Sequence, residues 1–325
     1  PTECADGFWL FEHERLAHGA VCVPDDPQRI VALDMPATEF ALLNDVPLIA
    51  VYGYVADEIS AISPGLAAKM DGLPRLDWAP NLEVVTELNP DLIIAFKDSS
   101  LFYEGMEAIA PVVVYDAAFF TDWKSSTAFW AEVFGKTEAF DEMLATYDAR
   151  VAELAEALGE DRGDIEVSLY YPNVDFPMIF LVDSAQGVIL QDVGLGRPAG
   201  QAVTFDEGGY TQGGADYGWV QLSAERVDLA DGDEIFMFAY PTTDPDQHAV
   251  LEESIIDYND NNPLWQALTA NKKDHVHIVG PHWFRAQTYL AANLILDDLF
   301  ATLTDVEPQI ASPAAEYLAA PAAEE

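Results

Sequence analysis

Short apolar runs alternate with stretches of helical spacing along most of the chain. In the first half these runs are RIVALD (29–34), PLIAVYG (47–53), PDLIIAF (90–96) and PVVVYD (111–116). In the second half they are IEVSLYY (165–171), MIFLVD (178–183) and HVHIVG (275–280). Runs of this length, separated by helical segments, are typical of βαβ units. The pattern therefore predicts an α/β fold built on parallel sheets.

One long segment between these halves has helical spacing throughout. It runs from Thr137 to Gly159 and has apolar side chains at Phe140, Leu144, Tyr147, Val151, Leu154 and Leu158. A helix of about twenty residues is near 30 Å long at 1.5 Å per residue. We expect it to connect two lobes, and the alternative is a surface helix within one lobe.

The chain of 325 residues is longer than the chains that usually fold around a single hydrophobic core, so two lobes of roughly 130 to 150 residues are expected. A further long helix is predicted from Ala286 to Leu303. The low-complexity end, residues 312–325, is predicted to be frayed. The expected divisions are an N-terminal segment (1–27), an α/β lobe (28–135), a connecting helix (136–160), a second α/β lobe (161–305) and a tail (306–325).

The chain repeats one sixteen-residue outline at domain scale. NLEVVTELNPDLIIAF (81–96) and SAERVDLADGDEIFMF (223–238) match at a constant offset, 225 − 83 = 142. In each copy a polar residue that can cap a helix stands two places before a glutamate, which predicts Glu83 and Glu225 in the first turn of a short helix. Such a carboxylate could serve the helix dipole, worth about 0.3 to 1 kcal/mol, or meet basic residues on a two-fold partner. The residues alone leave both readings open.

The charge balance is strongly acidic. Lys and Arg number 14 against 57 Asp and Glu, a formal net charge of −43, which repels nucleic acid and anionic membrane surfaces. We expect a solvated acidic surface suited to high salt, with one large cation-binding surface as the alternative. No apolar run reaches the roughly 18 residues of a membrane span, and no signal peptide is recognised, so a soluble mature form or a trimmed chain is expected.

Two cysteines, Cys4 and Cys22, stand alone near the N-terminus. Zinc would want four ligands, which His13 and His18 could complete only awkwardly. A disulfide is the preferred prediction, and it implies an oxidising compartment. Closing a loop of this length should stabilise the fold by about 3 kcal/mol.

Several segments together resemble one protein family, from about Pro27 to Leu303. They are PQRIVALDMPATEFALL, the two repeat segments, the long helix, WVQLSAERVDLADGDEIF, NPLWQALTANKKDHVHIVGPHWF and LAANLILDDL. This order is similar to that of the substrate-binding proteins of bacterial ABC importers for ferric siderophores, haem and cobalamin. The resemblance implies the class III fold, two Rossmann-like lobes with parallel-sheet cores joined by one long α-helix.

The same resemblance implies a function without catalysis. The lobes of such proteins sandwich a ligand, and one glutamate per lobe, here Glu83 and Glu225, docks on arginines of a dimeric permease. It implies a monomer without a resident cofactor, in the periplasm or on the extracytoplasmic cell surface, with a lipid anchor left open. The partners are the permease dimer and a small-molecule iron chelate.

Candidate ligand contacts lie in loops at the carboxyl ends of the predicted strands, where the cleft of a two-lobed α/β protein forms. Each aromatic side chain among them could instead belong to a core. The candidates are Tyr52, Arg75, Trp78, Lys97, Trp123, Trp219, Tyr240 and Trp283.

Ring faces suit a bulky chelate, and Arg or Lys would neutralise an anionic one. The small number of basic residues disfavours a highly charged ferric catecholate and favours a hydroxamate or mixed siderophore, with a corrinoid or haem as the runner-up.

A metal-dependent two-lobed enzyme is the alternative of another class. It would need ligands such as His275, His277 and His282, for which solvated imidazoles on an edge strand are the preferred interpretation.

Overall fold

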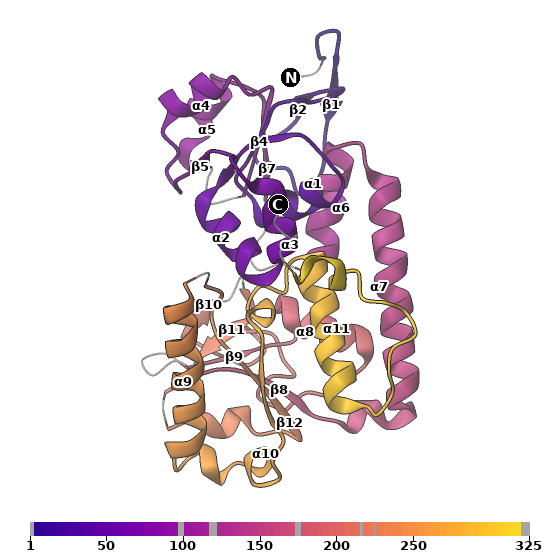
Figure 1. Ribbon diagram of the computed structural model, residues 1–325, viewed down its shortest axis with the longest axis vertical. Coiled ribbons are helices and arrows are strands. Elements are labelled where there is room, and N and C mark those ends of the chain that lie inside the picture. Colours follow the sequence, from indigo (N-terminus) through magenta and orange to yellow (C-terminus); the bar gives the residue numbers. More distant parts are fainter. Residues whose placement is uncertain are drawn as a thin grey trace, which may run out of the picture. The chain divides into compact units, whose positions relative to one another are not determined.

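The computed structural model describes residues 3–96, 101–116, 122–172, 177–214, 217–223, 225–242 and 244–319 (Figure 1). The chain divides into two compact units. The N-terminal unit holds residues 1–119, 123–144 and 316–325, and the C-terminal unit holds residues 120–122 and 145–315. Each unit contains a large sheet of its own, so the predicted α/β class is confirmed.

The sheet of the N-terminal unit has five strands in the order β5-β4-β3-β6-β7, all parallel. Val31, Ile93 and Val114 lie in its core and are fully buried. Strands buried on both faces need continuous apolar runs, which is why these segments were recognisable in the sequence. The strands are β3 (Ile30–Ala32), β4 (Leu48–Tyr52), β5 (Arg75–Leu76), β6 (Leu92–Phe96) and β7 (Val112–Tyr115).

Short helices join these strands. Asp34 caps the first of them by accepting a hydrogen bond from the Ala37 amide at 2.9 Å, and Asn81 caps the fourth by accepting one from the Glu83 amide at 2.9 Å. Each cap pairs a backbone N–H group that has no partner within the first helical turn, so the first residue of each helix is set by its local sequence. The helices are α1 (Met35–Leu43), α2 (Gly53–Ile62), α3 (Pro64–Ala67), α4 (Leu82–Leu88), α5 (Tyr103–Glu107) and α6 (Trp123–Val133).

The N-terminal segment forms a hairpin that the sequence analysis did not predict. Strands β1 (Phe8–Phe11) and β2 (Val21–Pro24) pair antiparallel, and the predicted disulfide between Cys4 and Cys22 is confirmed. The loop between them runs beside β7, where the Ala17 amide donates to the Val114 carbonyl at 3.0 Å. An edge strand that would otherwise expose unpaired amides is thereby covered.

The long helix is confirmed as α7 (Thr137–Leu158), 22 residues in length. Its residues up to Leu144 belong to the N-terminal unit, and those from Ala145 belong to the C-terminal unit. Tyr147, Arg150 and Leu154 are fully buried, and their spacing of three and four places them on one face of the helix.

The sheet of the C-terminal unit is mixed, which differs from the predicted parallel core. Its order is β10-β11-β9-β8-β12-β13, and only the neighbouring pairs β8–β12 and β12–β13 are parallel. Six residues (172–177) separate β8 from β9, and a parallel crossover needs about a dozen or more, so the chain can only turn back. The strands are β8 (Val167–Tyr171), β9 (Met178–Phe180), β10 (Gly213–Gly214), β11 (Trp219–Gln221), β12 (Glu234–Phe238) and β13 (Val276–Val279).

The second copy of the repeat folds differently from the first. Instead of an α-helix with Glu225 in its first turn, it forms the short 3₁₀ helix η5 (Val227–Ala230), and Glu225 lies in the turn before it. Asp231 and Gly232 follow at once, and both residue types disfavour a continuing helix. The prediction for Glu225 was therefore wrong in its local structure, although Glu83 lies in the first turn of α4 as expected.

Four α-helices complete the described part of the C-terminal unit. The last begins at Tyr289 rather than Ala286, because Thr288 caps it by accepting from the Ala291 amide at 3.4 Å. None of the helices in the described part of the chain is long and apolar enough to cross a membrane. They are α8 (Ala185–Val193), α9 (Pro245–Asn261), α10 (Thr269–Lys272) and α11 (Tyr289–Leu303).

The structure describes the segment after α11 up to Ala319, and the frayed end predicted from residue 312 is wrong for residues 312–319. Ala314 is buried, and Ala315–Tyr317 form the 3₁₀ helix η8. The alanine- and proline-rich composition concealed these contacts, because the segment is held by backbone groups and small side chains rather than by a periodic apolar face.

Candidate ligand-binding surfaces

Aromatic side chains gather where the parallel strands of the C-terminal unit end. Tyr171 is the last residue of β8, Tyr240 follows β12, and Phe284 follows β13 through the 3₁₀ helix η7 (Pro281–Trp283). The Phe284 ring lies 5.4 Å from that of Tyr171, 4.8 Å from that of Tyr240 and 6.5 Å from that of Phe238. The carboxyl ends of parallel strands meet at one edge, which is why loops far apart in sequence supply one cluster.

Arg285 places a cation within this aromatic cluster. Its guanidinium carbon lies 5.1 Å from the ring centres of both Tyr240 and Phe284, and its Nη2 donates a hydrogen bond to the Tyr240 hydroxyl at 2.6 Å. Burial raises the pKa of Tyr240, and the charge of Arg285 opposes that rise. The phenol therefore stays neutral at ordinary pH, and the cluster offers ring faces backed by one positive charge.

Trp283, a predicted ligand contact, points into the core instead. It is fully buried, stacks on Phe236 with ring centres 4.7 Å apart, and donates from Nε1 to Asp298 at 2.6 Å. Neighbouring residues of a 3₁₀ helix point about a third of a turn apart, so the Phe284 ring meets those of Tyr171 and Tyr240. The Trp283 ring instead stacks on that of Phe238, with ring centres 6.2 Å apart. The sequence HWFR offers both rings, and the structure leaves Phe284 half-buried and Trp283 fully buried.

The remaining tryptophan candidates differ in exposure. Trp123 is buried near Phe140, with ring centres 6.4 Å apart, so it offers no ring face to a ligand in this structure. Trp219 is half-buried on β11 and pairs with Phe180 in the sheet. Trp78 is 46% exposed and meets Phe102 edge to face at 5.6 Å.

A smaller aromatic group lies at the carboxyl ends of the strands in the N-terminal unit. Tyr52 ends β4 and stacks on Phe96, which ends β6, at 6.5 Å, and on Tyr54 at 5.7 Å. Arg75 of β5 forms an ion pair with Asp57 of α2, so its charge is already compensated. Lys97, the other predicted cation here, lies outside the described residues.

Asp34 is a buried carboxyl at the same end of this sheet that the sequence analysis did not single out. It follows β3 and caps α1. Burial raises its pKa to about 7, against the lowering effects of the hydrogen bond from the Ala37 amide and of the nearby Trp130 indole. The aspartate just before the predicted helix signalled the cap, but its burial could not be read from the sequence.

The three histidines do not form a metal site. His275 and His277 both contact the carboxylate of Glu234, at 3.0 and 2.7 Å, and His282 contacts Asp298 at 2.9 Å. The expected edge strand is confirmed as β13, and the two imidazoles at it remain partly exposed, 43% for His275 and 25% for His277, while they pair with the carboxylate. Within the part of the chain that the structure describes, no group of three or more His, Cys, Asp or Glu could hold a metal ion.

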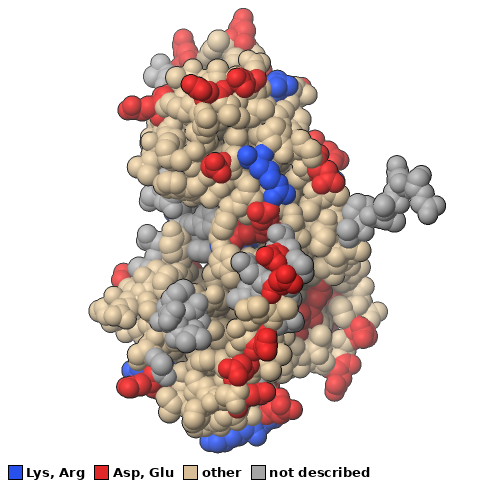
Figure 2. Space-filling model, turned by 60° about the vertical axis from the view of Figure 1, so that its left-hand side comes forward, with Lys and Arg blue, Asp and Glu red and all other residues tan. Residues whose placement is uncertain are grey.

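Both predicted docking glutamates are exposed. Glu83 lies at a groove of about 580 Å³ between α4 and α5, where Leu82, Pro90 and Ile109 supply apolar surface. Acidic side chains greatly outnumber basic ones on the face in Figure 2, as the charge of −43 leads one to expect. A basic partner would be attracted to such a surface at long range.

The sequence and the fold are similar to those of known proteins. The profile of the periplasmic binding protein family matches residues 74–282. YfiY of Bacillus subtilis, a probable siderophore-binding lipoprotein, is 30% identical over 288 residues, 85% of this chain and 82% of the relative. The ferric enterobactin-binding periplasmic protein FepB of Escherichia coli is 26% identical over 302 residues, 88% of each chain. The crystal structure of Staphylococcus aureus SirA complexed with staphyloferrin B has a TM-score of 0.72 and 23% identity, and covers 91% of this chain and 98% of that one. The chain belongs to the periplasmic binding protein family.

Proposed function

We propose that this protein is the extracytoplasmic solute-binding component of an ABC importer, and that it captures a ferric siderophore and delivers it to the permease. The observation that carries the proposal is the cluster of Tyr171, Tyr240 and Phe284 backed by Arg285, at the strand ends where α/β proteins bind ligands. The relatives named for siderophore binding support the ligand class. The disulfide agrees with an oxidising compartment.

The chemistry of the cluster favours a chelate of low charge. Among the described residues at the strand ends, Arg285 is buried against two rings and Arg75 is paired with Asp57, so these two offer little free positive charge to an anionic ligand. The strongly acidic chain would also repel a highly charged ferric catecholate. A hydroxamate or mixed siderophore fits better, and a corrinoid or haem is the second candidate because stacked rings also suit a macrocycle.

The proposal includes binding without turnover. Iron arrives as part of the ligand, so the protein needs no resident cofactor, and a monomer suffices. Glu83 and Glu225 are the proposed docking residues for basic side chains of the permease, supported by their exposure and their matching places in the repeat. Their different local structures, a helix turn and a loop turn, do not prevent docking, since a salt bridge needs only a reachable carboxylate.

A ligand panel tests the proposal. Tryptophan fluorescence of the ligand-free protein is titrated with a ferric trihydroxamate, a ferric citrate-hydroxamate, a ferric tris-catecholate, haem and cobalamin. We expect saturable binding of one ferric chelate, tightest for the hydroxamate-containing members, and no binding of the iron-free forms at the same concentration. Preference for cobalamin or haem would replace the siderophore assignment, and no binding by any member would overturn it.

A further inference from the structure

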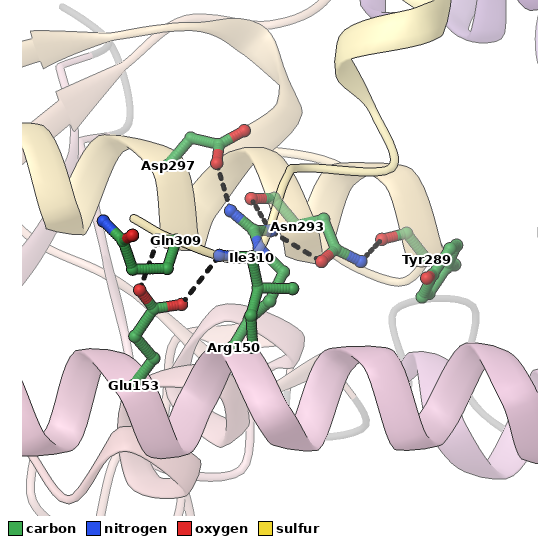
Figure 3. A network of polar contacts seen from close by, with 7 residues as sticks. All are labelled: Arg150, Glu153, Tyr289, Asn293, Asp297, Gln309 and Ile310. Atoms are coloured by element: carbon green, nitrogen blue, oxygen red, sulfur yellow. Dashed lines mark hydrogen bonds and ion pairs between the residues drawn. The ribbon is translucent and has the colours of Figure 1, made fainter. Parts of the chain in front are cut away.

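The segment after α11 is fixed to the second half of α7 by one carboxylate. Glu153 accepts hydrogen bonds from two successive backbone amides, that of Gln309 through Oε1 and that of Ile310 through Oε2, the latter at 3.1 Å (Figure 3). Hydrogen bonds to a charged acceptor are stronger than neutral ones, so this single side chain holds the backbone firmly.

The part of α7 that carries Glu153 is itself locked to α11. One turn earlier, Arg150 points into α11, donates to Asn293 Oδ1 at 2.7 Å and to the Asn293 carbonyl at 3.0 Å, and forms an ion pair with Asp297 (Figure 3). The Arg150 side chain has no exposed surface. These contacts fix the part of α7 that carries Glu153 to α11 within the C-terminal unit.

A few residues later the same segment lies against the N-terminal unit, to which residues from Glu316 belong. A Cβ added at Gly65 of α3 would come within 2.7 Å of the Ala319 carbonyl oxygen and 2.9 Å of Tyr317 Cα, so the backbone runs directly over this glycine. Burial raises the pKa of Tyr317. Lys69 and Asp45 of the N-terminal unit, which form an ion pair at 2.9 Å, lie near its hydroxyl: Lys69 lowers this pKa and Asp45 raises it.

We infer that residues 309–319 form a strap, a second mechanical connection between the two units in addition to α7. The strap has one anchor in each unit, at Glu153 and at Gly65. From Ile310 to Tyr317 there are seven residue steps (317 − 310 = 7), which reach at most about 25 Å when fully extended. Any movement that separates the anchors further must release one of them, so the strap limits how far the units can open about α7.

The inference is tested by electron spin resonance distance measurements on the whole chain. Spin labels go on cysteines introduced at two exposed positions, Glu87 in the N-terminal unit and Glu253 in the C-terminal unit. The native cysteines are joined in a disulfide and do not react. Two changes remove an anchor: Glu153→Ala, and a chain that ends at Ala315.

Each change has a matched control. Glu156→Ala removes an exposed carboxylate one turn further along α7, and a chain that ends at Ala319 keeps the contact with Gly65. We expect the distance distribution to broaden in both strap variants and to stay as in the parent in both controls, with unchanged circular dichroism. Distributions that superimpose on the parent would overturn the inference, and so would broadening by truncation alone, since the anchor on α7 would then be unnecessary.

Should either variant fail to fold, Gly65→Ala gives the same test without shortening the chain. Its Cβ would displace the strap backbone, because 2.7 Å is closer than such atoms approach. A broadened distribution supports the strap, and an unchanged one contradicts it.

Discussion

Asp297→Ala should destabilise the C-terminal unit far more than an ordinary loss of a surface carboxylate. Asp297 pairs with Arg150, whose side chain has no exposed surface, while that of Asp297 is 30% exposed. Removing one partner of a fully buried pair costs about 3 to 5 kcal/mol, because a buried charge is left uncompensated. Arg150 keeps its two bonds to Asn293, and Asp297 is partly solvated, so we expect about 2 to 3 kcal/mol.

The measurement is urea-induced unfolding followed by circular dichroism, with thermal unfolding as a second probe. For a unit of this size about 2 to 4 °C accompanies each kcal/mol, so the melting temperature should fall by about 4 to 12 °C. Asp148→Ala, which removes an exposed carboxylate from α7, is the control and should be neutral or slightly stabilising in so acidic a chain.

A conservative variant separates the charge from the hydrogen bond. Asp297→Asn removes the charge but keeps an oxygen that can accept from Arg150, so it should be less destabilised than Asp297→Ala. A free energy of unfolding for Asp297→Ala within about 0.5 kcal/mol of that for the Asp148→Ala control would refute this prediction, because ordinary surface substitutions differ by that much.

Three further outcomes follow from the structure. Reduction of Cys4–Cys22 should lower the free energy of unfolding by about 3 kcal/mol or less and leave ligand affinity unchanged; a parallel loss of affinity would contradict the separate roles of hairpin and ligand surface. Glu83→Ala and Glu225→Ala should keep fold and ligand affinity but reduce importer-dependent uptake, with Lys worse than Ala at either position, and normal uptake by the double variant would refute docking. The pKa of Asp34 is raised to about 7 in the fold, so its contribution to stability is present at acid pH and is lost as the pH rises from about 4 through 7. Asp34→Asn should remove this pH dependence of the free energy of unfolding. A pH profile of stability identical to that of the parent would show that Asp34 does not cause it.

Most strands and the long helix of this fold were predictable because buried elements require apolar residues at regular positions in the sequence. Four of the five parallel strands of the N-terminal unit (β3, β4, β6 and β7) and α7 were recognised in this way, whereas the two-residue strand β5 was not. The hairpin of residues 8–24 was not, because only parts of it are buried and a disulfide supplies some of its constraint. The mixed sheet also escaped prediction, since strand direction depends on connection length and pairing partner rather than on composition.

The candidate ligand surface was predictable as a region but not residue by residue. Tyr52 ends β4 and Tyr240 follows β12, so both lie at the end of an apolar run as predicted. Whether Trp283 or Phe284 faces outward depends on the phase of a single 3₁₀ turn and on the Asp298 acceptor that holds Trp283, fifteen residues further along. Such a tertiary partner leaves no local signal in the sequence.

Phe284→Ala, compared with Phe8→Ala, tests most directly whether the aromatic cluster of the C-terminal unit binds the ligand. Phe8 is 38% exposed on the N-terminal hairpin and provides a matched loss of one aromatic ring. The ferric chelate that binds the parent most tightly is titrated into each variant by calorimetry. The account predicts that Phe284→Ala weakens binding by at least about 1 kcal/mol, roughly five-fold in Kd, and that Phe8→Ala binds as the parent does. Equal affinity of the two variants for the chelate would contradict it.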